Sequence, residues 1–277
     1  MSVASFPSFA EEFFQHGGMP SPREIAHLEL EGGMELAFFP SVGPLSSSHC
    51  LIVPEEPVHS FAELDIDGLE ASFEAMLELR RLMKLDLGEN IILGEHGATG
   101  AGSRKVTTQQ KACLAHQGGA CTDHAHWHLS TTRGASYRVL DYYTAIGGRP
   151  ERFRNIRDLK KLEGTPYFML SLYPEAAHSL YIWRNPQEKF GEYTRQFFRR
   201  AVFAAISDAN IRDMRAGRNE GWDWHKKGDL PEVTRISDMV RTEFARPNYY
   251  AEPVTEEPRA QARGKIVKFI VHNLRTR

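Results

Sequence analysis

The chain of 277 residues is long enough to bury a substantial core and to form either one large domain or two modest ones. Hydrophobic residues make up 41% and charged residues 25%, as in ordinary globular proteins, and no run of about 18 apolar residues suggests a membrane span. With 34 basic and 36 acidic residues the formal net charge is −2, which excludes a general attraction to nucleic acids or to anionic membranes.

The first residues and the cysteines predict a cytoplasmic protein. The N-terminus lacks a basic segment and carries Glu11 and Glu12 where a signal peptide would be apolar. The cysteines form an odd and sparse set, which suits a reducing compartment better than a disulfide framework: Cys50, Cys113 and Cys121.

The first half of the chain has the pattern of strands around one helix. Short apolar runs at 34–39 and 50–53 are bounded by proline and glycine and predict a strand pair. Apolar residues at spacings near 3.6 predict an amphipathic helix over roughly 66–85. Residues 90–93 predict another strand, and a loop rich in Gly, Ser, Thr, Gln and Lys follows over 97–120.

The second half continues the alternation of strands and helices. Residues 167–172 and 179–183 predict a further strand pair, and 193–206 an amphipathic helix. In that helix we expect the phenylalanines to face the core and Arg199 and Arg200 to be solvated. The basic tail over 259–274 is expected to be partly helical. No clear linker separates two domains.

The segment CTDHAHWHLSTT, residues 121–132, places three of the 12 histidines at alternate positions: His124, His126 and His128. Successive side chains of a strand point to opposite faces, so the histidines would share one face and Ala125, Trp127 and Leu129 the other. Imidazoles at this spacing can surround one substrate group, and each can exchange a proton near neutral pH.

Three interpretations of the histidine segment compete. The three are an exposed strand without a role, a metal site, and a site of nucleophilic and acid–base catalysis at a phosphate. The series Cys113, His116, Cys121 and His124 contains only zinc-ligand types, although its spacing is not a common finger pattern. The catalytic interpretation gains support from a resemblance.

The segment DHAHWHLS resembles the signature of the histidine-triad (HIT) superfamily of nucleotide hydrolases and transferases. HCLIVPEEPVHSFAEL, residues 49–64, is similar to the stretch of that family in which a histidine opens a strand, a proline closes it and a turn leads to a helix. The helix, the strand and the triad then follow in family order. The resemblance covers roughly residues 34–132, under half of the chain.

The resemblance implies roles for four histidines. His126 would be the nucleophile, His124 and His128 would orient and protonate around it, and His49 would be the supporting fourth histidine. Attack of a neutral imidazole on the α-phosphorus gives a nucleotidyl-histidine that water or another acceptor resolves. Phosphate charge also needs donors, for which we expect these residues: Gly118, Gly119, Thr122, Ser130, Arg104 and Lys105. Ser130 stands where the family usually continues with apolar residues.

The resemblance gives no role to several other residues for which we have expectations. His59 is expected at the surface. Glu95 and His96 end a strand and either line the site or cap a turn. The two tryptophans within 221–225 either stack a base or fill a core.

The predicted fold is α+β: a HIT-like antiparallel meander sheet with a long helix on one face, extended by an additional α/β C-terminal half. We divide the chain into an N-terminal segment (1–33), a catalytic core (34–135) and a C-terminal extension (136–277). The predicted activity is hydrolysis of a phosphoanhydride or phosphoramidate bond at the α-phosphate of a nucleotide through a covalent nucleotidyl-histidine, without a cofactor.

Three alternatives stay open. One is nucleotidylyl transfer to phosphate or a sugar phosphate by the same histidine. The others are a metal-dependent hydrolase and a non-catalytic nucleotide-binding module. The predicted partner is a nucleotide, and the resemblance implies a homodimer, as in many small members of the family.

Overall fold

The computed structural model describes residues 26–30, 33–41, 45, 49–87, 90–97, 124–132, 134–172, 179–190 and 196–206. Most of the loop predicted over 97–120, the tryptophan pair within 221–225 and the basic tail over 259–274 lie outside these residues.

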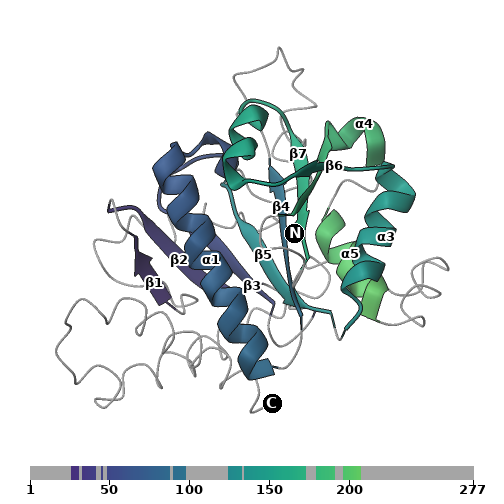
Figure 1. Ribbon diagram of the computed structural model, residues 1–277, viewed down its shortest axis with the longest axis horizontal. Coiled ribbons are helices and arrows are strands. Elements are labelled where there is room, and N and C mark those ends of the chain that lie inside the picture. Colours follow the sequence, from purple (N-terminus) through teal and green to yellow (C-terminus); the bar gives the residue numbers. More distant parts are fainter. Residues whose placement is uncertain are drawn as a thin grey trace, which may run out of the picture.

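An open antiparallel sheet of eight strands forms the centre of the described structure (Figure 1). Every neighbouring pair is antiparallel. Across the sheet the order is β1 (Ala26–Glu29), β2 (Glu35–Pro40), β3 (Cys50–Pro54), β5 (Trp127–Thr131), β4 (Ile91–Gly97), β7 (Tyr167–Ser171), β8 (Leu180–Arg184) and β6 (Glu151–Phe153).

Both faces of the sheet are buried, each in its own apolar cluster. On β4, Leu93 belongs to one cluster and its neighbour Ile92 to the other. Met169 and Phe168 on β7 divide in the same way. Because strand side chains alternate, near-continuous apolar runs are what a sheet covered on both faces requires.

Different helices cover the two faces. The first cluster contains side chains of α1 (Ile66–Leu87) and of two 3₁₀ helices, η2 (Phe61–Glu63) and η4 (Ile156–Leu162). Side chains of α3 (Ser136–Gly147), α4 (Pro186–Phe190) and α5 (Phe197–Ile206) belong to the second cluster. In Figure 1, α1 crosses the sheet far from α3, α4 and α5, which gather at the other side.

Arg80 fixes α1 to the middle of the sheet. Its guanidinium is buried and donates to the carbonyl of Ile91 at 2.8 and 3.1 Å, and to the hydroxyl of Ser171 at 2.9 Å. Ile91 begins β4 and Ser171 ends β7, so one side chain joins the helix to two central strands. A buried cation whose hydrogen bonds are satisfied in this way stabilises the packing of the helix on the sheet.

The α+β class and the antiparallel sheet are confirmed, with corrections in detail. The sheet departs from a meander at two points: β5 lies between β3 and β4, and β6 lies at the edge beyond β8. The strand predicted over 90–93 continues to Gly97, so Glu95 and His96 lie within β4. The described part of the predicted helix 193–206 begins at Phe197.

The expectation that Arg199 is solvated is wrong. Its side chain is 3% exposed and donates to the hydroxyl of Ser41 at 3.0 Å. The amphipathic pattern predicted a polar face for α5, but Arg199 in its first turn bonds to Ser41, which directly follows β2, so this charged side chain is covered.

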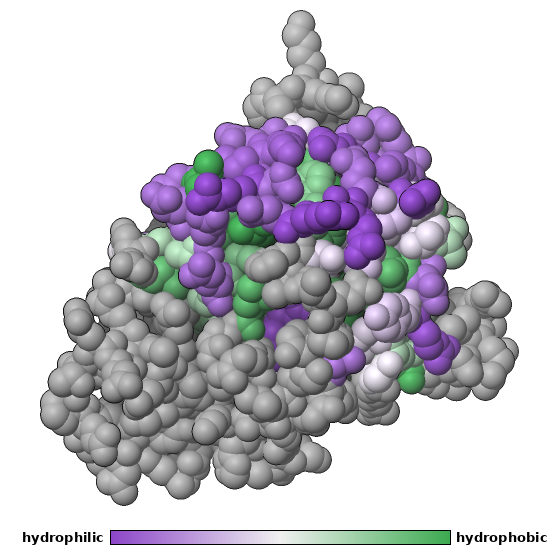
Figure 2. Space-filling view, in the orientation of Figure 1, coloured by the Kyte–Doolittle hydropathy of each residue, from purple (hydrophilic) through white to green (hydrophobic). Residues whose placement is uncertain are grey.

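The described surface is largely polar. Hydrophilic side chains cover much of the described surface in Figure 2, with apolar residues in small areas between them. Ile66 and Tyr137 are the large apolar residues exposed among those the structure describes. None of the described helices combines the length and the apolar character of a membrane span.

Candidate active site

Four histidines meet where β5 and β3 pair. His128 lies in β5, with His124 and His126 on the approach to it, and His49 immediately precedes β3. Leu51 of β3 pairs with His128, which brings His49 alongside it. All four side chains are buried, with 2–6% of each exposed.

The alternation predicted for the triad is confirmed, although the strand begins only at Trp127. Ala125, Trp127 and Leu129 belong to the apolar cluster under α1. On the opposite face the rings of His126 and His128 lie with centroids 4.8 Å apart. The alternation of side chains along an extended segment therefore suffices to separate the imidazoles from the core residues between them.

A backbone carbonyl determines where His126 carries its proton. Nδ1 of His126 lies 3.0 Å from the carbonyl oxygen of His124. Because a carbonyl only accepts, Nδ1 must donate, and the lone pair of the neutral ring belongs to Nε2. The same contact would stabilise positive charge that develops on the ring when Nε2 forms a bond.

A second chain of hydrogen bonds determines the proton position of His128. The backbone N–H of Leu45 donates to Nδ1 of His49 at 3.3 Å, so neutral His49 carries its proton on Nε2. That Nε2 lies 3.2 Å from Nδ1 of His128 and donates to it. His128 therefore presents an N–H at Nε2, and the two central histidines have opposite roles at the same atom.

His124 has a different environment from the other two members of the triad. Its Nε2 donates to the carbonyl oxygen of Pro54 at 2.7 Å, which joins the approach of β5 to the end of β3. This bond orients the ring and holds the chain segment whose own carbonyl bonds to His126. In this geometry His124 supports the position of His126.

The site keeps its histidines neutral. Burial, reinforced by Arg199 and His126, holds the pKa of His49 well below its usual value. Burial also lowers the pKa of His126 to about 4, and burial together with the neighbouring histidines and Arg199 holds that of His128 well below 6.5. The pKa of His124 is lowered by burial, against the opposing effect of the Pro54 carbonyl. Above about pH 6.5 the cluster therefore carries no imidazolium charge.

Phe198 and Arg199, to which sequence reasoning gave no role in the site, border it together with His96, for which lining the site was one of two expectations. Phe198 of α5 stacks on His128, with ring centroids 5.0 Å apart and an interplanar angle of 20°. The ring of His96 lies 5.9 Å from that of His128. Arg199 exerts its charge on both His49 and His128. The alternation of side chains along β4 could have predicted from local sequence the face on which His96 lies, whereas no local pattern predicts that α5 reaches the site.

The predicted phosphate donors have an uneven outcome. Ser130 lies on the same strand two residues beyond His128, but its hydroxyl is fully buried and donates to the carbonyl of Thr131 at 3.1 Å. The other predicted binding residues lie outside the described residues: Gly118, Gly119, Thr122, Arg104 and Lys105. Cys113, His116 and Cys121 of the metal alternative lie outside them as well.

A buried carboxyl group supports β5 from the opposite face. Glu95 accepts from the indole Nε1 of Trp127 at 3.0 Å and from the backbone N–H of Phe61 at 2.8 Å. The Phe61 ring in turn stacks on Trp127, with centroids 3.7 Å apart. Burial raises the pKa of Glu95 to about 7, against the effect of these donors.

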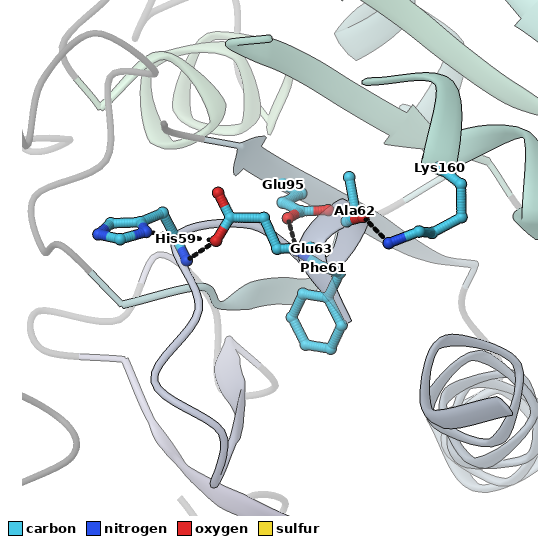
Figure 3. A network of polar contacts seen from close by, with 6 residues as sticks. All are labelled: His59, Phe61, Ala62, Glu63, Glu95 and Lys160. Atoms are coloured by element: carbon cyan, nitrogen blue, oxygen red, sulfur yellow. Dashed lines mark hydrogen bonds and ion pairs between the residues drawn. The ribbon is translucent and has the colours of Figure 1, made fainter. Parts of the chain in front are cut away.

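Figure 3 shows how this support continues outward along η2. Lys160 of η4 reaches the carbonyl of Ala62 at 2.8 Å, and Glu63 accepts from the backbone N–H of His59 at 2.9 Å. His59 is partly exposed, in line with its expected surface position. The network is structural, since it lies on the face of β5 that the histidines leave to the core.

The described residues offer nucleophilic and acid–base chemistry through imidazole. Burial raises the pKa of Cys50 to about 12, so its thiol stays protonated and does not compete as a nucleophile. Within the described part of the chain no group of three or more His, Cys, Asp or Glu side chains is arranged to hold a metal ion.

Comparison with known proteins adds no family to these observations. No protein-family model matches the chain, and no curated protein matches it significantly.

Proposed function

We propose that the chain is a histidine-triad-type nucleotide hydrolase with a HIT-like sheet, which cleaves a phosphoanhydride or phosphoramidate bond at the α-phosphate. The observation that carries the proposal is the pair of opposite tautomers in the buried cluster. His126 has its lone pair on Nε2, and His128 has its proton on Nε2. A nucleophile and a hydrogen-bond donor with rings 4.8 Å apart are what a displacement at phosphorus needs.

In the first step Nε2 of His126 forms a bond to the α-phosphorus, and the bond from phosphorus to the leaving group breaks. The leaving group departs with the bonding electron pair and accepts a hydrogen bond from Nε2–H of His128, and a leaving nitrogen takes its proton from solvent water. Positive charge then lies on the nucleotidylated ring of His126, where the carbonyl of His124 accepts the Nδ1–H bond more strongly. The lowered pKa of His126 supports this role, because a neutral ring is the nucleophilic form.

In the second step water attacks the phosphorus and the bond to His126 breaks. The water proton passes to solvent while the lone pair returns to Nε2 of His126, which restores the starting tautomers and releases a nucleoside monophosphate. Hydrolysis is proposed over transfer because water needs no additional binding pocket. With another acceptor the same intermediate would yield a nucleotidylyl transfer.

The decisive experiment is intact-mass measurement of the protein after brief incubation with dinucleoside polyphosphates, nucleotide sugars and nucleoside phosphoramidates. An acid-labile increase of one nucleoside monophosphate is expected on the wild type and is expected to be absent from His126→Ala. His59→Ala is the matched histidine control, because His59 bonds to Glu63 outside the cluster, and it should retain the adduct.

Two outcomes would overturn the proposal: turnover that persists in His126→Ala, or no adduct and no turnover on any substrate of the panel. Adding inorganic phosphate or a sugar phosphate to the incubation identifies the acceptor. A nucleotidylated acceptor in place of a free monophosphate would convert the proposal into the transferase alternative.

A further inference from the structure

Phe198 belongs to α5, far along the chain from the triad, yet it contacts the histidine cluster directly. Its ring stacks on His128 and lies 6.2 Å from the ring of His49, measured between centroids. The side chain is fully buried. The displacement chemistry described above assigns no role to it.

Strand β4 contains a hollow that admits the Phe198 ring. Gly94 pairs with His128 across β4 and β5, so the space above its Cα adjoins the imidazole. A Cβ at Gly94 would lie 2.1 Å from Cδ2 of Phe198. Such a distance is far below van der Waals contact, so only glycine allows the ring to lie against the sheet at this point.

His96 holds the same residue by its backbone. Nε2 of His96 accepts the N–H of Phe198 at 3.0 Å. This N–H belongs to the first turn of α5, where no intrahelical acceptor exists, so the side chain supplies the partner that a buried N–H requires. Gly94 and His96 are two residues apart and therefore act from one face of β4.

We propose that Phe198 is a positioning residue of the histidine site: seated over Gly94 and held by His96, its ring fixes the plane of the His128 imidazole. In that orientation Nε2–H of His128 is directed at the leaving group. The inference rests on the proposed function and deepens it, because it assigns to the C-terminal part of the chain a role in directing the hydrogen bond that His128 donates to the leaving group.

The physical reason is contact between two flat rings. A nearly parallel phenyl ring restricts rotation of the imidazole about its Cβ–Cγ bond and excludes water from that side. The charged and titratable groups around His128 come from every packed element: His49 before β3, His126 before β5, His96 of β4 and Arg199 of α5. All of them disfavour a second proton on His128, so the ring stays neutral with its single proton on Nε2.

The test compares three variants of the full chain: Phe198→Leu, Gly94→Ala and Gly147→Ala. Gly147 is the matched control, because a Cβ there would also lie 2.1 Å from a phenylalanine, Phe190, whose ring contacts Phe168 and Phe197 and not Phe198 or His128. Nitrogen-15 NMR of the imidazoles reports the tautomer and titration of His128 without any substrate. Steady-state kinetics on the substrate identified by mass measurement report kcat and KM.

In Phe198→Leu and Gly94→Ala we expect His128 to lose its single tautomer and to titrate at a higher pH than in the wild type. We expect kcat to fall about tenfold to a hundredfold with little change in KM, since a misdirected donor acts only in the transition state. Gly147→Ala should lose stability while the His128 signals stay unchanged.

The inference is overturned if His128 has the same tautomer and titration in Phe198→Leu and Gly94→Ala as in the wild type. It is also overturned if Gly147→Ala alters His128 as much as Gly94→Ala does, because general loosening would then explain both. Failure of the proposed function is a separate result: it shows as a wild type without a nucleotide adduct, whatever the NMR spectra show.

Discussion

Both faces of strand β5 are buried, yet the polar side chains on the two faces differ in their hydrogen bonding. On the face under α1, both carboxylate oxygens of Glu95 accept a hydrogen bond, from Trp127 and from Phe61. On the other face a hydrogen bond at Nδ1 of His126 and of His128 fixes whether Nε2 of each ring carries a proton. A polar group with all its atoms engaged stabilises structure, whereas a directed nitrogen can react.

The two faces also differ in the sign of their pH dependence. The histidine pKa values are lowered on folding, so the folded state binds fewer protons and stability falls as pH drops from about 6.5 through about 4. The pKa of Glu95 is raised to about 7, so the folded state binds more protons and stability falls as pH rises from about 4.5 to about 7. Variants on each face can therefore test the comparison separately.

The largest effect is expected from His128→Gln. Loss of the Nε2–H hydrogen bond to the leaving group should lower kcat about 100- to 1,000-fold on substrates with poor leaving groups. The loss should be much smaller on a nucleotide with an acidic phenol as leaving group, whose anion needs little stabilisation. His59→Gln is the control with the same substitution, and its kcat should change little because the His59 ring bonds to Glu63 outside the cluster. Equal losses with both leaving groups would contradict the donor role.

His49→Leu should have a smaller effect on the same step. Without the Nε2–H of His49, the proton of His128 is no longer confined to Nε2, and we expect kcat to fall roughly tenfold to a hundredfold. Imidazole NMR should show a mixture of tautomers at His128. A single Nε2–H tautomer in this variant would mean that the relay from Leu45 through His49 does not set the proton position.

On the other face, Glu95→Gln should destabilise the fold by about 1–3 kcal/mol at pH 8, because an amide cannot accept from both donors. The difference from the wild type should be larger at pH 5 than at pH 8, narrowing by roughly 3 kcal/mol as Glu95 ionises in the wild type. Urea unfolding at the two pH values measures this. A difference that is independent of pH would show that Glu95 titrates normally.

The smallest effect is expected from Lys160→Met, at the outer end of the network in Figure 3. The ammonium group donates to the carbonyls of Ala62 and Leu64 at 2.8 and 2.7 Å and is partly exposed. Its loss should cost about 1 kcal/mol of unfolding free energy, because water replaces part of the bonding. Thermal unfolding measures the cost, and kcat should be unchanged. A loss of kcat would mean that the two faces are coupled.

Local pattern was sufficient for the division of β5 into two faces. Alternation of side chains is a property of the extended backbone, so His124, His126 and His128 could be separated from Trp127 before any tertiary contact was known. Helix α1, which covers one face of the sheet, was likewise predicted from the spacing of its apolar residues. His49 was reached only through resemblance, because nothing local relates it to a strand so much later in the chain.

Only the tertiary structure decided what surrounds the reactive nitrogens. Pairing of β3 with β5 brings His49 to His128, and the hydrogen bonds of both then select the tautomers. Docking of α5 buries Arg199 and seats Phe198 over Gly94, which no periodicity predicts because those partners lie more than a hundred residues apart. The sequence by itself determined which residues share a face; long-range pairing determined which atom of each residue can react.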